Sequence, residues 1–223
     1  YIKQRAYIPK SLTYSILRRL HDNSVNVLVP SLSMVEELER YNFKNLKVWK
    51  RGVDTELFNP NKRNRNDNDI QLTYVGRVAI EKNIEEFLKL KGNYNKTVVG
   101  DGPELQKYIN KYPEVNFVGL KRGNELAEYY ANADVFVFPS KTDTLGNVIL
   151  EALACGTPIA AFPVTGPKDI LKDSKINTLD DRLGNSVEKA LKVNRNDCRE
   201  FAMKFTWEDC ANEFLDSQID SKN

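Results

Sequence analysis

The sequence is poor in the residues that build several common kinds of functional site. Among 223 residues there is one histidine, His21, and there are three cysteines, Cys155, Cys198 and Cys210. The cysteines are odd in number, and none belongs to a Cys-x-x-Cys pair of the zinc or redox type. We therefore expect no disulfide framework, no histidine-rich metal site and no serine–histidine hydrolase. Scattered thiols of this kind fit a reducing compartment.

A strong charge of one sign is also missing. The chain has 33 Lys and Arg against 31 Asp and Glu, a formal net charge of +2. Any anion site must then be local, and no nucleic-acid partner is expected. No apolar run approaches the roughly 20 residues of a membrane span, and no signal peptide is visible, so we expect a cytoplasmic protein. The first residue is Tyr1 and not Met, which leads us to expect a piece of a longer protein.

Two familiar motifs are incomplete. The stretch VVGDGPE, 98–104, offers Gly100 and Gly102, but Leu105 stands where the third glycine of a dinucleotide fingerprint would fall. No hydride-transfer cofactor is expected, and a tight turn into a helix with Pro103 at its first position explains these residues as well as a ligand does. Asp67-Asn68-Asp69 lies in an Asn-rich stretch, where we expect a solvated loop and no metal ion.

What the sequence does contain, from about residue 70, is a regular alternation of two patterns. Short apolar runs rich in β-branched residues alternate with amphipathic helical stretches, which is typical of a doubly wound parallel sheet in an α/β domain. In such sheets ligands bind at the carboxyl ends of the strands. The expected strands are 72–76, 97–100, 115–119, 134–140 and 158–162, and the expected helices are 82–92, 103–112, 124–133 and 147–156.

The flanking segments predict a remnant of a second α/β domain. Strand-like runs at 26–31 and 46–52 enclose a helical stretch at 33–41, and residues 10–22 look helical. The stretch 59–69 is polar and reads as a loop, whereas 195–219 is helical with aromatics expected in the core. The domain prediction is 1–50 as the end of an N-terminal domain, 51–70 as a linker, 71–205 as a ligand-binding domain and 206–223 as a closing helix.

The first candidate site is KTDTLGNVILEALACG, 141–156. Gly146 has no Cβ, and the unpaired N–H groups of the helix that follows favour a phosphate. Glu151 lies one turn past Asn147, about 6 Å along the axis, where a carboxylate can accept two hydrogen bonds from a ribose diol. Asp143 lies outside the helix and could face another part of the same ligand. The simpler alternative is that Asp143 or Thr144 is an N-cap and Glu151 a solvated helix residue.

The second candidate site is GRVAIEKN, 76–83. It places Arg77 and Lys82 at the turn after the first strand of the sheet. Arginine grips a pyrophosphate with two N–H groups and lysine adds a point charge, so the pair suits a diphosphate leaving group. The simpler alternative is a surface ion pair between Lys82 and a nearby glutamate, such as Glu81.

Taken together, these stretches resemble the retaining glycosyltransferases of the GT-B fold known as group 1 or family 4. The resemblance covers about residues 25–215 and is far more specific than any one motif. It rests on VPS (29–31), RGVDTELFNP (51–60), GRVAIEKN (76–83), VVGDGPE (98–104), NFVG (116–119), ADVFVFPSKTDTLGNVILEALACGTPIAA (133–161) and FTW (205–207).

The resemblance implies a role for each matching residue. The Glu-x7-Glu motif of the family falls on Asp143 and Glu151, with Asp143 toward the donor sugar and Glu151 at the ribose. Arg77 and Lys82 would neutralise the diphosphate. Asp143, Arg77 and Lys82 are thus the expected catalytic residues. The backbone contacts to the donor would come from Gly76, from Gly119 and Leu120 near the base, and from Gly146, Asn147 and Val148.

The implied activity is transfer of a hexose from a nucleoside-diphosphate sugar to a lipid or glycan acceptor, with GDP-mannose as the first donor and a UDP-hexose as the second. No metal or other cofactor is expected, and the acceptor would be held mainly by the N-terminal domain. Peripheral contact of the full protein with the cytoplasmic face of a membrane is a further expectation. Two alternatives stay open: an inert nucleotide-sugar-binding scaffold, and a sugar-phosphate epimerase of the same fold.

Overall fold

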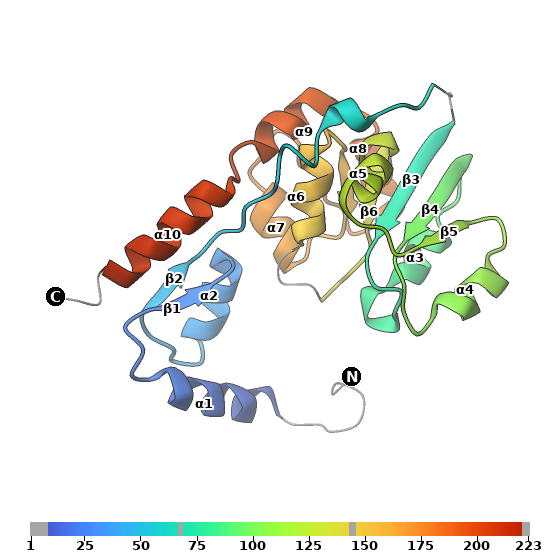
Figure 1. Ribbon diagram of the computed structural model, residues 1–223. Helices are drawn as coiled ribbons and strands as arrows, with labels where there is room; N and C mark the ends of the chain where they lie inside the picture. Colours follow the sequence, from blue (N-terminus) through green and yellow to red (C-terminus); the bar gives the residue numbers. More distant parts are fainter. Residues whose placement is uncertain (1–8, 67–68, 143–145, 220–223) are drawn as a thin grey trace. The chain divides into compact units, whose positions relative to one another are not determined.

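The structure is a computed structural model that describes residues 9–66, 69–142 and 146–219 (Figure 1). The chain divides into two compact units. The small unit comprises Tyr1–Lys50 with Asp209–Asn223, and the large unit comprises Arg51–Glu208. The identification of residues 1–50 as the end of an acceptor domain stays a prediction.

The large unit contains the predicted doubly wound sheet, with five parallel strands in the order β5-β4-β3-β6-β7. Each strand falls within or overlaps one of the apolar runs expected from the sequence, so the predicted α/β class is confirmed. The strands are β3 (Ile70–Val75), β4 (Tyr94–Val99), β5 (Asn116–Gly119), β6 (Val135–Phe138) and β7 (Ile159–Ala161).

The helices of the large unit differ from the expectation in three places. Lys82 ends a short 3-10 turn, η3 (Ile80–Lys82), and does not begin an α-helix. Pro103 lies before α4 and is not its first residue. Helices α7 and α8 were not predicted. The first turn of α7 contains Gly166 and Pro167, which are typical of turns in a sequence, although a proline is tolerated in the first turn of a helix. The helices are α3 (Ile84–Leu88), α4 (Leu105–Lys111), α5 (Gly123–Asn132), α6 (Asn147–Ala154), α7 (Thr165–Leu171), α8 (Leu183–Ala190) and α9 (Arg195–Ala202).

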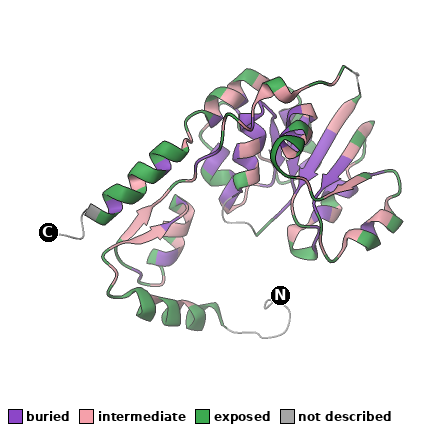
Figure 2. Cartoon of the chain, in the orientation of Figure 1, coloured by how far each residue is buried: buried purple, intermediate pink, exposed green. Residues whose placement is uncertain are grey.

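Helices cover both faces of the sheet, and each face has its own core (Figure 2). Val75, Phe136 and Ile159 point to the face covered by α5, α6, α7 and α9. Leu72 and Val135 point to the other face, against α3, α4 and α8. Because successive residues of a strand face opposite sides, strands buried on both faces must be apolar throughout. This explains the unbroken apolar runs in the sequence.

The small unit contains a parallel pair of strands, β1 (Val27–Val29) and β2 (Leu46–Val48), joined through α2 (Leu32–Glu39). Helix α1 (Lys10–His21) precedes them, and Val29, Leu38 and Phe43 form the core. In the described part of the chain, no helix is both long enough and apolar enough to cross a bilayer.

The C-terminal stretch 195–219 is helical, as expected, and forms two helices, but not all of its aromatics are core residues. Helix α9 belongs to the large unit and α10 (Trp207–Ile219) mostly to the small one. Phe201 and Phe205 pack against the core, whereas Trp207 and Phe214 are 51% and 41% exposed. Between the two helices, the carbonyl of Phe205 accepts a hydrogen bond from the amide of Val53 at 2.9 Å.

Candidate functional site

The two predicted motifs meet where the strand order of the sheet reverses. Strand β3 pairs with β4 on one side and with β6 on the other, so the loops after β3 and β6 leave the same edge of the sheet in opposite directions. Ligands of open α/β sheets bind at such a switch point. The loop 76–83 follows β3 and the loop 139–146 follows β6, and topology therefore brings Arg77 and Lys82 near the start of α6.

Two hydrogen bonds hold these loops together. The side-chain amide of Asn83 donates to the carbonyl of Pro139 at 2.9 Å, and the Thr142 hydroxyl donates to the carbonyl of Glu81 at 3.4 Å. Asn83 has a left-handed backbone, φ 53°, which Asn tolerates better than most residues. Asn83 was not among the predicted site residues, although an asparagine directly before an apolar helix is a usable signal for such a turn.

Glycines let the ends of β3, β4 and β5 approach closely. The amide of Gly76 donates to Val99, and the amide of Gly100 donates to Gly119 at 2.8 Å. A Cβ on Gly100, whose φ is +140°, would lie 1.9 Å from the carbonyl oxygen of Gly76. Gly100 is thus required by backbone packing alone. A Cβ on Gly119 would meet nothing within 4 Å, and the neighbouring Leu120 is 62% exposed, so this part of the edge is open.

The two predicted cations lie on the loop after β3. Arg77 is exposed, and its Nη1 lies 3.4 Å from Oε1 of Glu81. Lys82 is partly buried at the end of η3. Ion pairs as exposed as Arg77–Glu81, whose side chains are 47% and 51% accessible, contribute little to stability. A phosphate can therefore replace Glu81 as the partner of Arg77 at low cost.

Helix α6 begins at Asn147 with Gly146 as its N-cap, and among the residues that the structure describes no side chain caps it. Asp143 and Thr144, the alternative N-cap residues, lie outside the described residues. Asn147 is exposed and Val148 partly buried, so the first amides of the helix lie at the accessible edge. Asp143 lies outside the described residues, and its orientation toward a donor sugar stays a prediction.

Glu151 is not a solvated helix residue. It is partly buried, and its Oε2 accepts a hydrogen bond from the Tyr130 hydroxyl at 2.7 Å. Burial raises the pKa of Glu151, and the hydrogen bond from Tyr130 opposes that rise only in part. Tyr130 comes from α5 and is fully buried. Sequence analysis missed it, because its place in an apolar helical period marks it only as core.

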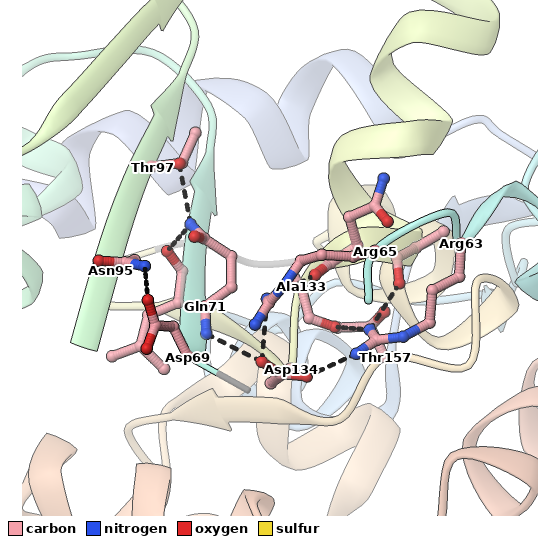
Figure 3. Close-up of polar contacts among 12 residues, drawn as sticks. Arg63, Arg65, Asp69, Gln71, Asn95, Thr97, Ala133, Asp134 and Thr157 are labelled. Carbon is pink, nitrogen blue, oxygen red and sulfur yellow. Dashed lines mark hydrogen bonds and ion pairs between the residues drawn. The ribbon is translucent and has the colours of Figure 1, made fainter. Parts of the chain in front are cut away.

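The opposite, amino edge of the sheet carries a cluster of charges that was also missed (Figure 3). Asp134, directly before β6, accepts hydrogen bonds from Arg63 and Arg65 at 2.8 and 3.0 Å and from the amide of Gln71 at 2.9 Å. Burial alone would raise the pKa of Asp134, but these donors lower it overall. Arg195 donates to the carbonyls of Ala131 and Ala133. The predicted loop 59–69 is thus fastened to the large unit.

Two hollows lie at this amino edge, of about 300 and 370 Å³. Arg65 lines both, Asp69 lines the smaller one, and none of the predicted site residues lines either. Asp67 and Asn68 lie outside the described residues. In the rest of the chain that the structure covers, no three His, Cys, Asp or Glu side chains are grouped so that they could hold a metal ion.

Comparison with known protein families gives a match over residues 56–204 to the family "Glycosyl transferases group 1". Two curated relatives are the sulfoquinovosyl transferase SQD2 of Arabidopsis thaliana and a GDP-mannose-dependent alpha-mannosyltransferase of Mycobacterium tuberculosis. The chain is 34% identical to the first over 181 residues and 33% identical to the second over 171, with 73% of the chain covered each time. It spans 35% and 45% of their respective lengths.

Solved structures give the same fold. Sucrose-phosphate synthase from Thermosynechococcus elongatus superimposes with a TM-score of 0.82 at 24% identity, over 100% of this chain and 66% of that one. HepE of Anabaena, in complex with UDP-glucose, superimposes with a TM-score of 0.74 at 15% identity, over 94% and 68%. Both are GT-B glycosyltransferase structures, and the five-stranded parallel sheet of this chain, with its flanking helices, matches them. With a family match over 149 of 223 residues, the chain belongs to the group 1 glycosyltransferases.

Proposed function

We propose that this chain is the nucleotide-sugar-binding half of a retaining, metal-independent hexosyltransferase. The observation that carries the proposal is the meeting of the Arg77–Lys82 loop and the start of α6 at the switch point of the sheet. Cationic side chains and helix amides at one edge suit a diphosphate, and a partly buried carboxylate further along α6 suits a ribose diol.

The proposed reaction is departure of the nucleoside diphosphate from the same face of the sugar at which the acceptor attacks. Arg77, Lys82 and the amides at Asn147 and Val148 stabilise the negative charge that develops on the leaving phosphate. The leaving phosphate accepts the acceptor's proton, and Asp143 contacts the sugar. The acceptor, a lipid or glycan, binds mainly to the N-terminal domain of the full-length protein.

GDP-mannose is the first donor to test, because one relative in the same range of identity is named a GDP-mannose-dependent enzyme. A UDP-hexose is the second, since HepE shares the fold and is solved with UDP-glucose. A catalytically inert nucleotide-sugar-binding scaffold would also use this edge, and only turnover of a full-length protein distinguishes the two.

The test is a thermal-shift series with GDP, UDP and ADP. A nucleotide present at about 100 times its Kd stabilises the folded state by about 2.7 kcal/mol, which raises Tm by roughly 5–10 °C for a domain of this size. We expect one nucleotide to give such a shift and Glu151→Ala and Lys82→Ala to lose it. Glu128→Ala on the exposed face of α5 is the matched control and should keep it. No shift with any nucleotide would refute the proposed function, and unchanged shifts in both variants would refute the residue assignment.

A further inference from the structure

The carboxylate of Glu151 has a partner that the family motif does not account for. Tyr130 lies on α5, 21 residues earlier in the chain, and donates its hydroxyl hydrogen bond to Oε2 of Glu151 at 2.7 Å. Hydrogen bonds to a charged acceptor are stronger than neutral ones, and a buried carboxylate depends on them because water cannot replace them. One carboxylate oxygen of Glu151 is thereby engaged by the protein itself.

The Tyr130 ring is held rigidly. Phe58 and Phe136 pack edge-on against it, with ring centroids 5.8 and 5.4 Å away. The backbone carbonyl of Tyr130 accepts a hydrogen bond from the Thr157 hydroxyl at 2.6 Å, and Arg195 donates to the same hydroxyl at 3.1 Å. A ring fixed by packing, with its backbone fixed by this chain of hydrogen bonds, places its hydroxyl at one point.

We propose that Tyr130 is a positioning residue for Glu151, which fixes the orientation of the carboxylate so that it can receive the vicinal diol of a nucleoside ribose. This inference rests on the proposed function, because it takes Glu151 as the ribose contact. Tyr130 does not touch the ligand. It determines which rotamer of Glu151 is populated before the nucleotide arrives, and preorganisation of this kind increases affinity without adding a contact.

The same hydrogen bond favours the ionised form of the carboxylate, because it lowers the pKa that burial raises. Only an ionised carboxylate accepts hydrogen bonds from both hydroxyls of a diol while also accepting one from Tyr130. Cys155, the C-cap residue of the same helix, also interacts electrostatically with Glu151, but burial raises the pKa of that thiol to about 12, so it stays neutral. Helix α9 packs against α6, and its Arg195 and Arg199 donate to backbone carbonyls, among them those of Ala131 and Ala154.

The sign of the pH effect follows. The pKa of Glu151 is already raised by burial, and Tyr130 opposes the rise. Removing the Tyr130 hydroxyl therefore moves the pKa of Glu151 further upward, because the hydrogen bond that opposes the effect of burial is lost. Binding that needs the ionised carboxylate is present above this pKa and is lost as the pH falls through it, so Tyr130→Phe loses binding at a higher pH than the wild type.

The experiment compares two ligands that differ only in the diol. Isothermal titration measures Kd for GDP and 2′,3′-dideoxy-GDP, or for the corresponding UDP pair, between pH 5 and 8. The ratio of the two Kd values cancels the titration of the phosphates and any general loss of folding. We expect a ratio well above ten in the wild type at pH 8, about a tenfold smaller ratio in Tyr130→Phe, and a ratio near one in Glu151→Gln.

The control is Tyr108→Phe, which removes a hydroxyl from another buried tyrosine, on α4 in the core of the opposite face. Its ratio and pH midpoint should equal those of the wild type. If the wild type and Glu151→Gln behave as expected but Tyr130→Phe keeps the wild-type ratio at every pH, the positioning role is overturned and the proposed function stands. If the wild type binds neither ligand, or shows a ratio of one, the fault lies with the proposed function.

Discussion

The two edges of the large unit's sheet use arginine in opposite ways. At the carboxyl edge, Arg77 is 47% exposed and has a loose partner in Glu81 at 3.4 Å. At the amino edge, Arg65 is only 14% exposed, and it shares Asp134 with Arg63 at 3.0 and 2.8 Å. One edge keeps a cation accessible to a ligand, whereas the other binds its cations to the protein. The side chain is the same, and its burial and partners decide whether it stabilises the fold or is available for binding.

The largest loss of stability is expected for a substitution in the backbone at the carboxyl edge of the sheet. Gly100→Ala places a Cβ 1.9 Å from the carbonyl oxygen of Gly76 at a φ of +140°, and neither main chain can move without breaking strand contacts. We expect a loss of more than about 3 kcal/mol in the free energy of unfolding, measured by urea denaturation.

Gly184→Ala is the matched control, because a Cβ there meets nothing within 4 Å. It should change the free energy of unfolding by less than about 1 kcal/mol, in the stabilising direction for a helical glycine. A Gly100→Ala protein as stable as this control would show that the carboxyl edge is not set by close backbone packing.

An intermediate effect is expected at the amino edge. Asp134→Ala leaves the Arg63 and Arg65 guanidinium groups without their shared carboxylate and the amide of Gln71 without its acceptor. We expect a loss of about 2–3 kcal/mol in the free energy of unfolding, with nucleotide Kd changed less than twofold. Glu128→Ala, an exposed carboxylate on α5, is the control. A large change in Kd with unchanged stability would reverse the roles assigned to the two edges.

The smallest effect on stability is expected for Arg77→Gln, which should act on binding instead. Its ion pair is exposed, so the free energy of unfolding should change by less than about 0.5 kcal/mol. Affinity for a nucleoside diphosphate should fall by about tenfold, and affinity for the monophosphate by less, because arginine grips two phosphates bidentately. Titration calorimetry with both nucleotides measures the difference. Equal losses for the two ligands would argue against contact with the diphosphate.

The sequence predicted the elements that follow a regular pattern along the chain, namely apolar strands that alternate with amphipathic helices. Strands buried on both faces leave unbroken apolar runs, so β3 and β6 could be placed without coordinates. Arg77 and Glu151 could be proposed as site residues because their neighbours form motifs. Tyr130 was not, since a hydroxyl that meets a carboxylate 21 residues away leaves no local pattern. Helix α7 was missed because local turn signals outweighed a packing advantage that exists only in the folded sheet.

The hydrogen bonds that hold residues 55–65 against the rest of the large unit were not predicted either, because their partners are distant in sequence. A polar stretch with no apolar period reads as a linker, yet Arg63 bonds to α5 and to Asp134. Arg199 of α9 donates to the carbonyls of Thr55 and Phe58. The partners lie 68 to 144 residues away in sequence, beyond the reach of any short window.

These hydrogen bonds determine where the large unit can be cut to give a stable recombinant fragment. A fragment that begins at residue 71 removes the first residue of β3, leaves Asp134 without either arginine and leaves Arg199 without the carbonyls of residues 55 and 58. A fragment 51–208 retains them, and its ends meet, since a Cβ on Gly52 would lie 2.6 Å from the backbone of Trp207. Termini that close are also where a circular permutant could be joined, with new ends opened in an exposed loop.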